Sequence, residues 1–406
     1  MTASHPVRPD ASPLLRKERF LLPDGILYLD GNSLGPLPRH VPERLDGTVR
    51  EEWGQSLIRG WNEHGWMDMP RRIGDRIARL IGADPGTVVL GDTLSIKVHQ
   101  ALSAALEMRP ERRLILSDSG NFPTDLYMAE GLIAELDRGH ALRLGAPEDV
   151  IDRIDDSVAA VMLTHVDYRT GRLHDMEAIT RAAHAAGAVM IWDLAHSAGA
   201  LPLDLAGLGA EFAVGCTYKY LNGGPGAPAF IQVRPDLIDA IRPALSGWLG
   251  HAAPFAFEPS YRPGEGIERM RVGTPPVLQM AALDAALDLW DDVDMDRLRA
   301  ASIRLSERFI SEVEARCPEL DLASPRDPEA RGSQVSFRHP EGYAMMQALI
   351  ADGVIGDFRA PDLMRFGFTP LYLSEADVVA AVDVLERITR TRSWDRSEFR
   401  ARARVT

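Results

Sequence analysis

Apolar residues along this chain change their spacing in a regular way, and the change predicts strands that alternate with helices. Short apolar runs typical of buried strands lie at 87–91, 113–118, 159–166 and 188–193. Between them, apolar residues recur every three or four positions at 71–82, 96–108, 124–136 and 176–187. Repeated strand–helix units of this kind predict an α/β fold, with a mostly parallel sheet covered by helices on both faces.

The pattern changes on either side of this region. Two further apolar runs, 212–218 and 227–233, predict a pair of strands, and long amphipathic helices follow at 278–293 and 296–317. The last part reads as a small α+β unit, whereas the first 50 residues are rich in Pro and Gly. We therefore expect an N-terminal arm over 1–50, a large α/β domain over 51–285 and a small α+β domain over 286–406.

Composition narrows the class of protein. The chain has 406 residues, of which 45% are hydrophobic, and its formal net charge of -14 argues against a nucleic-acid partner. Cys216 and Cys317 are the two cysteines and form no CxxC pair, so no disulfide framework, no thiolate zinc site and no other metal site is expected. No run approaches the roughly 18 apolar residues of a membrane span. These features favour a cytoplasmic protein that acts on a small molecule.

Three polar residues follow predicted strands, at the sheet edge where α/β proteins bind ligands. Ser95 begins the helix after the first strand, and its free N–H groups would favour a phosphate. Asp193 ends an apolar run, where a carboxylate needs a partner or a cation. Taken alone, each is equally explained as a cap of the next helix or turn.

The third residue is Lys219, in the stretch "CTYKYLNGGPGAPAF" (216–230). A lysine that emerges from a buried strand end has a depressed pKa and can form a Schiff base with a carbonyl group. The glycines after it allow a sharp turn and a close approach. A solvated surface lysine is the ordinary alternative. Lysine, acid and anion site together are the set that pyridoxal 5'-phosphate (PLP) requires.

Five motifs carry a family resemblance, and they occur in register over nearly the whole chain. The motifs are "YLDGNSLGPLP" (28–38), "NFPTDLY" (121–127), "WDLAHSAGALPLDL" (192–205), "TYKYLNGGPGAPAF" (217–230) and "MRFGFTPLYLSEADV" (364–378). The chain resembles kynureninase, a PLP enzyme of the aspartate aminotransferase fold with a seven-stranded, mostly parallel sheet. The resemblance implies hydrolysis of L-kynurenine to anthranilate and L-alanine through an aldimine and a quinonoid. 3-Hydroxykynurenine would be a secondary substrate, and the pathways would be tryptophan catabolism and NAD biosynthesis.

The resemblance also assigns roles to residues. Lys219 would form the aldimine and move the Cα proton, and Asp193 would pair with the pyridinium nitrogen. Apart from the resemblance, Tyr218 is our candidate for the acid that protonates the β-carbon, because its hydroxyl would lie beside both the lysine and the phosphate and be acidified there. Phe122 would stack on the ring, and Asp125 would line it. Alone, none of these residues specifies a cofactor.

The remaining assignments concern the phosphate, the substrate and the partner subunit. Further cofactor contacts implied by the resemblance are Leu94, Ser95, Thr164, His196, Trp248 and Thr274, the last two from a neighbouring subunit of a homodimer. Substrate contacts would be Arg365 for the α-carboxylate, Trp61 over the aryl ring, and Asn32. Without the resemblance, Trp61 and Trp248 would be core residues, Thr274 a helix cap, His196 a packing residue and Arg365 a surface residue.

Other functions stay open at the level of sequence. The nearest rival is another PLP lyase of the same fold, such as a cysteine desulfurase-like enzyme, but Cys216 lies in a strand and Cys317 toward the end of a helix. A ligand-binding protein without turnover is a second alternative. A nucleotide-binding dehydrogenase lacks its GxGxxG motif here. Within the resemblance, Thr274 and the tryptophans near residue 61 match the bacterial type and favour unsubstituted kynurenine.

Overall fold

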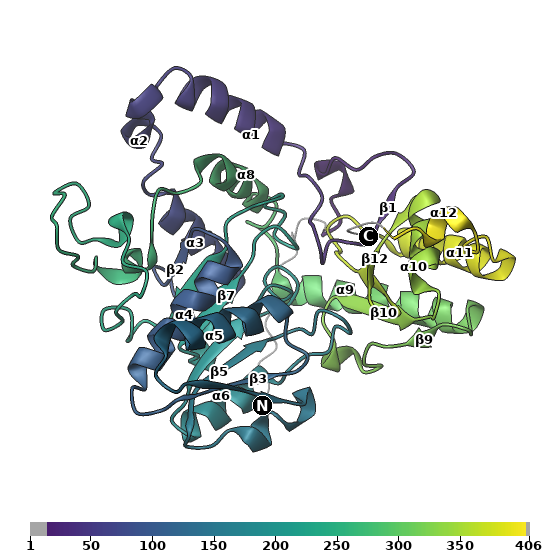
Figure 1. Cartoon of the computed structure of the whole chain (residues 1–406). Coiled ribbons are helices and arrows are strands. Elements are labelled where there is room, and N and C mark those ends of the chain that lie inside the picture. The colour runs from purple at the N-terminus through teal and green to yellow at the C-terminus, as the bar shows by residue number, and fades with distance from the viewer. Residues whose placement is uncertain (1–13, 403–406) are drawn as a thin grey trace, which may run out of the picture.

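A seven-stranded sheet forms the centre of the larger of two lobes in the computed structural model, which describes residues 14–402 (Figure 1). The strand order is β2-β8-β7-β6-β5-β3-β4. β8 is antiparallel to both of its neighbours, and the other adjacent pairs are parallel. The predicted α/β class with a mostly parallel sheet is confirmed. The strands are β2 (Val88–Leu90), β3 (Leu114–Asp118), β4 (Ala141–Gly145), β5 (Val158–Thr164), β6 (Val189–Asp193), β7 (Phe212–Gly215) and β8 (Phe230–Val233).

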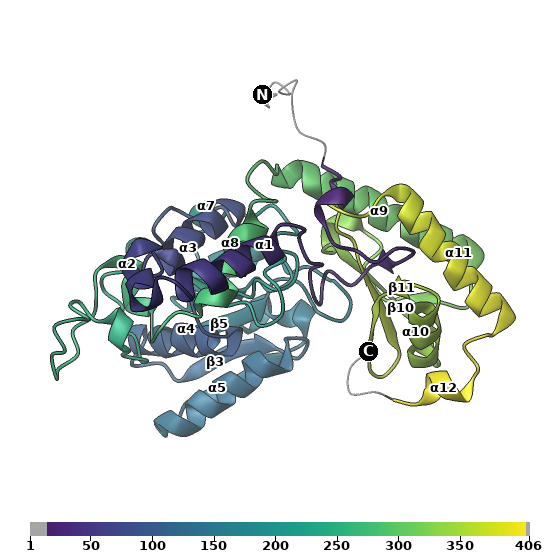
Figure 2. The same cartoon turned by 90° about the horizontal axis from the view of Figure 1, so that it is seen from above.

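Alternation along the central strands places apolar side chains on both faces of this sheet. In β5, Val161 and Leu163 join one hydrophobic cluster, whereas Ala160 and Met162 join a second cluster on the opposite face. The first cluster is covered by α3 (Met69–Leu80), α6 (Met176–Ala185), α7 (Leu205–Leu208) and α8 (Val277–Leu287), and the second by α4 (Leu94–Met108) and α5 (Pro123–Leu136). The sheet is therefore buried on both sides, as Figure 2 shows from above.

The smaller lobe is built on a four-stranded antiparallel sheet. Its strand order is β12-β13-β10-β9, from β9 (Asp321–Leu322), β10 (Gln334–Arg338), β12 (Asp357–Arg359) and β13 (Leu363–Gly367). Its helices are α9 (Met295–Arg316), α10 (Gly342–Ala351), α11 (Glu375–Thr391) and α12 (Ser397–Arg400). The strand β1 (Leu27–Tyr28) pairs with β11 (Val354–Ile355), so the N-terminal segment is part of this lobe before it crosses to α1 (Val41–Gly47) on the large lobe. A π-helical turn (Thr48–Trp53) and α2 (Gly60–Glu63) then lead into α3.

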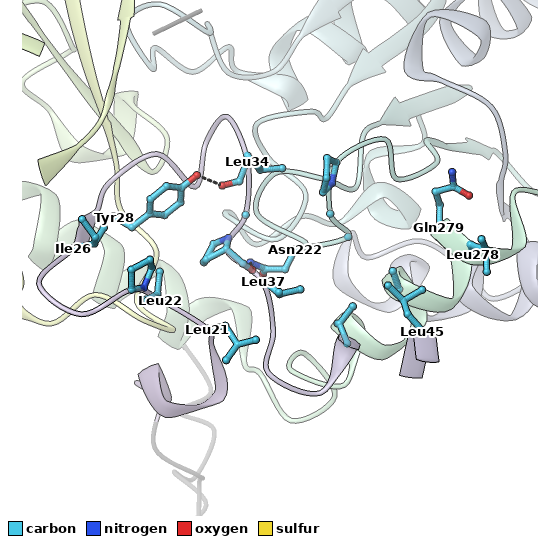
Figure 3. A pocket seen from close by; sticks show the side chains of 18 of the residues that line it. Leu21, Leu22, Ile26, Tyr28, Leu34, Leu37, Leu45, Asn222, Leu278 and Gln279 are labelled. Carbon is cyan, nitrogen blue, oxygen red and sulfur yellow. Dashed lines mark hydrogen bonds between the residues drawn. The ribbon is translucent and has the colours of Figure 1, made fainter. Parts of the chain in front are cut away.

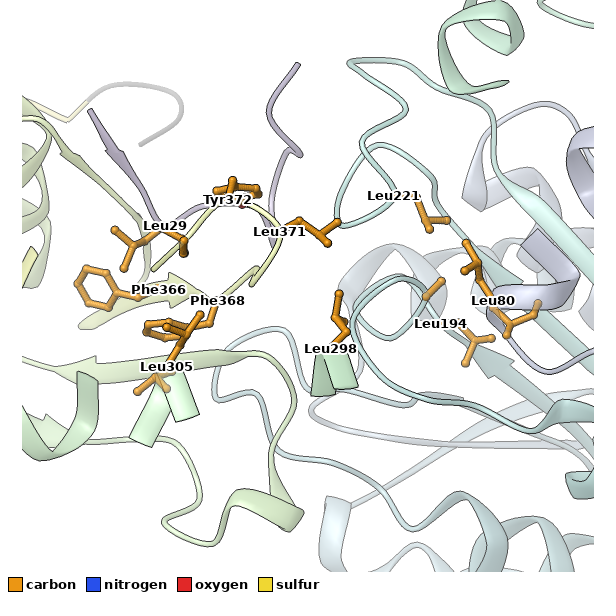
Figure 4. Close-up of a cluster of buried hydrophobic side chains, with 14 of the residues drawn as sticks. Leu29, Leu80, Leu194, Leu221, Leu298, Leu305, Phe366, Phe368, Leu371 and Tyr372 are labelled. Carbon is orange, nitrogen blue, oxygen red and sulfur yellow. The ribbon is translucent and has the colours of Figure 1, made fainter. Parts of the chain in front are cut away.

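One hydrophobic core runs from the large lobe into the small lobe. Figure 4 shows part of this cluster. Its labelled members are Leu29, Leu80, Leu194, Leu221, Leu298, Leu305, Phe366, Phe368, Leu371 and Tyr372, and each is buried. Because β1 and β13 contribute to the same core as the loop after β7, the two lobes are held together beside the sheet edge.

The structure differs from the sequence prediction at the end of α8. The pattern predicts a helix over 278–293, but α8 ends at Leu287 and tighter turns follow it. The Arg76 guanidinium contacts Asp284, Asp288 and Asp291 at 2.9, 2.8 and 2.9 Å. Because one guanidinium contacts three carboxylates, the chain after Leu287 favours tighter turns over a continued α-helix. These turns also bury Trp290 completely.

The helix α9 is the longest in the small lobe, with 22 residues, and carries charged side chains along its length. Between residues 14 and 402, neither α9 nor another helix is both long and apolar enough to span a bilayer.

The N-terminal segment packs closely on the loop that carries Lys219, and a substitution at Gly35 tests this packing. A Cβ atom at residue 35 would lie 2.3 Å from the Lys219 carbonyl oxygen and 2.9 Å from Asn222 Cα. We therefore expect Gly35→Ala to lower the free energy of unfolding by about 1–3 kcal/mol, measured by urea denaturation. The control is Gly131→Ala in α5, where the added methyl meets nothing within 4 Å, and which should raise stability by up to about 1 kcal/mol. Equal stability of the two variants would contradict this packing.

Candidate active site

Asp193 is the last residue of β6 and sits in the centre of the sheet edge. It is 2% exposed, and its register partner on β5 is Thr164. The Thr164 hydroxyl lies 3.3 Å from Asp193 Oδ2, and the Ala195 amide donates to Asp193 Oδ1 at 2.9 Å. Burial raises the pKa of Asp193 to about 6, although the charge of Lys219 and these hydrogen bonds lower it. The site therefore holds a buried acid that needs a cation or an N–H donor.

Lys219 lies in the loop between β7 and β8, and its charge acts on Asp193. Its Nζ atom lies 3.0 Å from His196 Nε2 and 5.7 Å from the centre of the Tyr218 ring. The loop turns back through Asn222 and Gly224, both at positive φ. The Gly35 amide donates to the Tyr218 carbonyl at 2.8 Å, so the N-terminal segment fixes the backbone next to the lysine.

The sequence contains three lysines, and the other two are engaged elsewhere. Lys17 forms an ion pair with Asp377 at 2.7 Å in the small lobe. Lys97 is fully buried in α4 and donates to Gln100 at 3.0 Å. Lys219 is therefore the lysine placed to react with a ligand at the sheet edge.

His196 is 4% exposed and is the hydrogen-bond partner of Lys219. Burial, and then the charges of Lys219 and Arg365, hold the pKa of His196 well below its usual value, so the imidazole is neutral. Nε2 then accepts from the Lys219 ammonium, and Nδ1 carries the remaining proton. Nδ1 is buried with no partner among residues 14–402, so it is free to donate to a bound molecule.

Phe122 and Asp125 lie at the start of α5, and the charges of Asp193 and Lys219 act on Asp125. Phe122 is 40% exposed, and its ring meets Tyr168 edge to face with centroids 5.1 Å apart. Asp125 is 1% exposed, and burial together with the charge of Asp193 raises its pKa well above the usual value. Asp125 Oδ2 has no hydrogen-bond partner in the described part of the chain. Two neighbouring carboxyl groups therefore share the field of one lysine.

A cavity of about 330 Å³ opens at the N-terminus of α4. Thr93, Leu94, Cys216, Tyr218 and Gly226 are among the residues that line it. Thr93 is the N-cap residue, yet its side chain makes no capping hydrogen bond, so the first amides of α4 stay available to an anion. Ser95 lies in this first turn, as the sequence predicts for a phosphate site.

The environment of Tyr218 corrects one expectation. The neighbouring Cys216 and burial raise the pKa of the Tyr218 hydroxyl, so this chain does not acidify it. The sequence predicts acidification beside both Lys219 and the cofactor phosphate, but within the chain the charge of Cys216 and burial favour the neutral phenol. A phenol that keeps its proton is still able to act as an acid.

Arg365 lies in β13, directly opposite Asp357 of β12. It is 1% exposed. Its Nε donates to Asp357 Oδ1 at 2.5 Å, and its Nη2 donates to Asp357 Oδ2 and to Ser33 Oγ. Its Nη1 donates to the Tyr168 carbonyl, which places the guanidinium across the junction of the two lobes.

The other predicted residues are not brought to Lys219 by these contacts. Trp61 lies in α2 and packs edge to face on Trp66, at 5.4 Å. Trp248 is 44% exposed and packs on Phe255 and Phe257 in its own loop.

Thr274 and Asn32 are also placed by the structure. Thr274 borders a small hollow with Gly91 and Asp92, next to α4. Asn32 is fully buried against Gly367, and its side-chain amide has no partner within residues 14–402. Thr274 thus lies near the predicted phosphate site, and Asn32 near Arg365.

The sequence did not point to three residues that contact the predicted site residues in the structure. Asn121 accepts from Thr164 at 2.5 Å and donates to Ser117, and Asp357 and Tyr168 hold Arg365. The signal for Asp357 was a charged residue in a mostly apolar stretch near residue 357. For Tyr168 there was none, because its backbone carbonyl makes the contact.

Comparison with solved structures defines the class of protein. A C-DES variant with glycine covalently linked to its PLP cofactor is 19% identical, with a TM-score of 0.77 over 89% of this chain and 97% of that chain. The cysteine desulfurase from Thermococcus onnurineus NA1 is 19% identical, with a TM-score of 0.77 over 96% of this chain and 100% of that chain. At these identities the likeness concerns the fold alone. It is the fold of PLP-dependent enzymes.

Sequence relatives define the family. The family model described as the kynureninase C-terminal domain matches residues 298–385. Kynureninases from Pseudomonas fluorescens and Burkholderia pseudomallei (strain 1106a) are each 51% identical over 397 residues, 96% of this chain and 95% of the relative. The chain belongs to the kynureninase family, as the motifs predict, and pyridoxal 5'-phosphate is the cofactor. The cysteine desulfurase alternative is supported by the fold only.

The residues present fit PLP. His196 Nδ1 and Asp125 Oδ2 are buried atoms without partners in the described chain, and a ligand with both an acceptor and a donor would satisfy them. Asp193 suits a ring N–H, the amides at the start of α4 suit a phosphate, and Lys219 suits an aldehyde.

Replacement of Asp193 should raise the stability of the cofactor-free protein and lower its affinity for PLP. The folded pKa of about 6 lies above the unfolded value of about 3.9, so the stabilising contribution of this group is present at low pH and is lost as the pH rises through about 6. We expect Asp193→Asn to raise the Tm of the cofactor-free protein at about pH 8 by a few degrees. The same change should weaken PLP binding about tenfold or more, measured by absorbance titration.

The matched control for this experiment is Asp156→Asn, at an exposed aspartate. It should leave both Tm and PLP affinity unchanged. An Asp193→Asn protein with wild-type PLP affinity would contradict the assignment.

Proposed function

We propose that this chain hydrolyses L-kynurenine to anthranilate and L-alanine, and that 3-hydroxykynurenine is a secondary substrate. Membership of the kynureninase family supports the reaction. The observation that carries it is the placement of Lys219 Nζ at 3.0 Å from a neutral His196, in the field of the buried acids Asp193 and Asp125. A surface or packing role explains none of these contacts.

PLP, when bound, supplies an aldehyde for the substrate amine and a ring that stores negative charge. Asp193 holds the proton of the ring nitrogen, because a buried carboxylate is stabilised by an N–H donor. Thr164 and the Ala195 amide keep this carboxylate oriented. Phe122, which is exposed at the start of α5, would cover one face of the ring.

Arg365 binds the substrate, and Lys219 moves its Cα proton. Arg365 Nη1 faces the junction of the lobes and binds the α-carboxylate, while Asp357 fixes the rest of the guanidinium. Lys219 Nζ takes the Cα proton, and His196 Nε2 holds the lysine in place. Lys219 returns this proton to Cα later in the cycle, before alanine leaves.

Tyr218 is the acid that we assign to the β-carbon. Its ring lies 5.7 Å from Lys219 Nζ, and its hydroxyl keeps a proton because its pKa is raised by Cys216 and by burial. After water adds to the γ-carbonyl, the bond between the β-carbon and that carbonyl breaks, and the β-carbon needs one proton. The proton that the added water gives up when the carboxyl group of anthranilate forms then restores the Tyr218 hydroxyl.

We also infer that the working unit is a homodimer with shared sites. Trp61, on α2, lies at the end of the large lobe away from the small lobe that carries Arg365 (Figures 1 and 2). Trp248 is exposed among aromatic side chains of its own loop. Both residues would therefore act in the site of a second copy.

An apolar hollow of about 650 Å³ beside the lysine loop supports this assembly (Figure 3). The N-terminal segment, α1, α8 and residues 222–225 line it, and Leu21, Leu34, Leu37 and Leu278 on its wall are exposed in one chain. Exposed apolar surface of this extent is typical of a protein interface. A second copy would cover it and complete the neighbouring site.

The state of the cysteines supports a cytoplasmic location, and two site residues support a substrate preference. Both cysteines, Cys216 and Cys317, are free and buried, which suits the reducing cytoplasm. Thr274 and Trp61 support a preference for unsubstituted kynurenine, because they match the bacterial type. A role in tryptophan breakdown or NAD synthesis would follow from the reaction.

The reaction is tested by adding each of the two kynurenines to the PLP-loaded protein. We expect anthranilate fluorescence and one alanine per anthranilate from L-kynurenine, with a higher kcat/KM than for the 3-hydroxy compound. Lys219→Ala should lower kcat by about a hundredfold or more, because it removes the proton carrier. Gly131→Ala, on the surface of α5, is the control and should keep wild-type rates. Release of sulfur from cysteine without anthranilate formation would contradict the proposal.

The shared site is tested by mixing two inactive variants. Lys219→Ala and Trp248→Ala chains, unfolded and refolded together, should form hybrid dimers in which one site has both changes and the other has neither. We expect up to about a quarter of wild-type activity in an equal mixture, against almost none for either variant alone. Sites confined to single chains would give no recovery of activity.

A further inference from the structure

Arg365 belongs to a cluster of four charged groups, and the balance of charge in this cluster depends on one carboxyl group of the N-terminal segment. Asp357 accepts from Arg365, from Arg359 Nη2 at 2.7 Å and from Ser33 Oγ at 2.8 Å. Asp30 begins the turn that carries Ser33, whose hydroxyl contacts both Asp357 and Arg365. Its carboxyl group is repelled by Asp357 and attracted by both arginines. Two arginines therefore face two aspartates in a nearly closed space.

Asp30 is held in this place by its own backbone. The amides of Ser33 and Leu34 donate to the Asp30 carbonyl at 2.9 and 3.0 Å, which folds the segment back on itself. Asp30 Oδ1 is buried and has no hydrogen-bond donor within residues 14–402. An ionised oxygen without a donor is costly in such a place, and a protonated one is not.

Among residues 14–402, Arg365 and Arg359 are the cations whose charge favours the ionised form of Asp30. The titratable groups that act on it or are acted on by it are Tyr28 of β1, Asp357 and Arg359 of β12, Arg365 of β13, Tyr220 of the lysine loop and Tyr372 after β13. Burial, and then the charge of Asp357, raise the pKa of Asp30 to about 7. A hydrogen bond with the Ser33 side chain, and then the charges of Arg365 and Arg359, limit this rise in pKa.

A bound carboxylate would change this balance. Arg365 has five N–H groups, and Asp357, Ser33 and the Tyr168 carbonyl take four of them. An anion at Nη1 therefore adds a negative charge next to Asp357 while the number of cations stays the same. The group in this cluster that can remove a negative charge near neutral pH is Asp30.

We propose that Asp30 takes up a proton when the carboxylate of a substrate binds Arg365, so that substrate affinity falls as the pH rises. The inference rests on the proposed function, because it needs a carboxylate at Arg365. Asp30 is a positioning residue in this scheme: it touches neither the reacting atoms nor the cofactor.

The test compares the pH dependence of KM for L-kynurenine in the holoenzyme and in Asp30→Asn. An amide resembles the protonated acid and cannot titrate. From about pH 6 to about pH 9 the wild-type KM should rise about tenfold for each unit by which the bound carboxylate raises the pKa of Asp30. Asp30→Asn should remove this rise in KM, and Asp24→Asn, at an exposed aspartate of the same segment, should keep it. Equal KM profiles in wild type and Asp30→Asn would overturn the proposal.

A calorimetric measurement makes the result independent of turnover. L-Alanine binding to the holoenzyme at about pH 7.5, in buffers of different ionisation enthalpy, should show up to about one more proton taken up by wild type than by Asp30→Asn. Should Asp30→Asn fail to fold, Asp30→Ser is expected to give the same differences. Absence of anthranilate formation would reject the proposed reaction, whereas equal proton uptake in both proteins would reject the role of Asp30.

Discussion

The site depends on one buried acid and one lysine delivered to the same point by neighbouring strands. β6 and β7 run parallel, with Asp193 opposite Val214, so the loop that follows β7 starts beside the acid. An unpaired carboxylate with 2% exposure would be strongly destabilising, and the field of Lys219 offsets part of this cost. The rest of the free-energy cost of burying this carboxylate is offset when a ligand brings its own N–H donor. The same burial that destabilises the empty protein therefore favours the cofactor.

The other parts of the fold keep this pair in position. The glycine-rich turn after Lys219 brings β8 back antiparallel to β7, and Gly215 leaves room for the Phe230 ring. The N-terminal segment closes over the turn through the hydrogen bond from Gly35 to Tyr218. Because this segment also pairs with β11, the small lobe and the lysine loop are linked by one short stretch of chain. Arg365 thus reaches the edge of a sheet to which it does not belong.

Sequence reasoning succeeded where the relevant contacts are local. Apolar runs predict the strands, and a polar residue directly after a run, such as Asp193, predicts the edge at which ligands bind. It failed for α8, because the early end of that helix depends on Arg76, some 200 residues away. It also missed Asp357 and Asp30, whose partners come from other elements, and a backbone carbonyl such as that of Tyr168 leaves no trace in a sequence. Family motifs supplied Trp61 and Trp248, and the fold of one chain alone does not bring these two to Lys219.

We expect the cofactor to bond to Lys219. Since the sequence contains three lysines, reduction of the PLP-loaded protein with borohydride, followed by digestion and mass spectrometry, gives a direct answer. We expect a phosphopyridoxyl group on Lys219, with Lys17 and Lys97 unmodified, because Lys17 is ion-paired in the small lobe and Lys97 is buried. A label on Lys97 or Lys17, or no label after reconstitution, would contradict it.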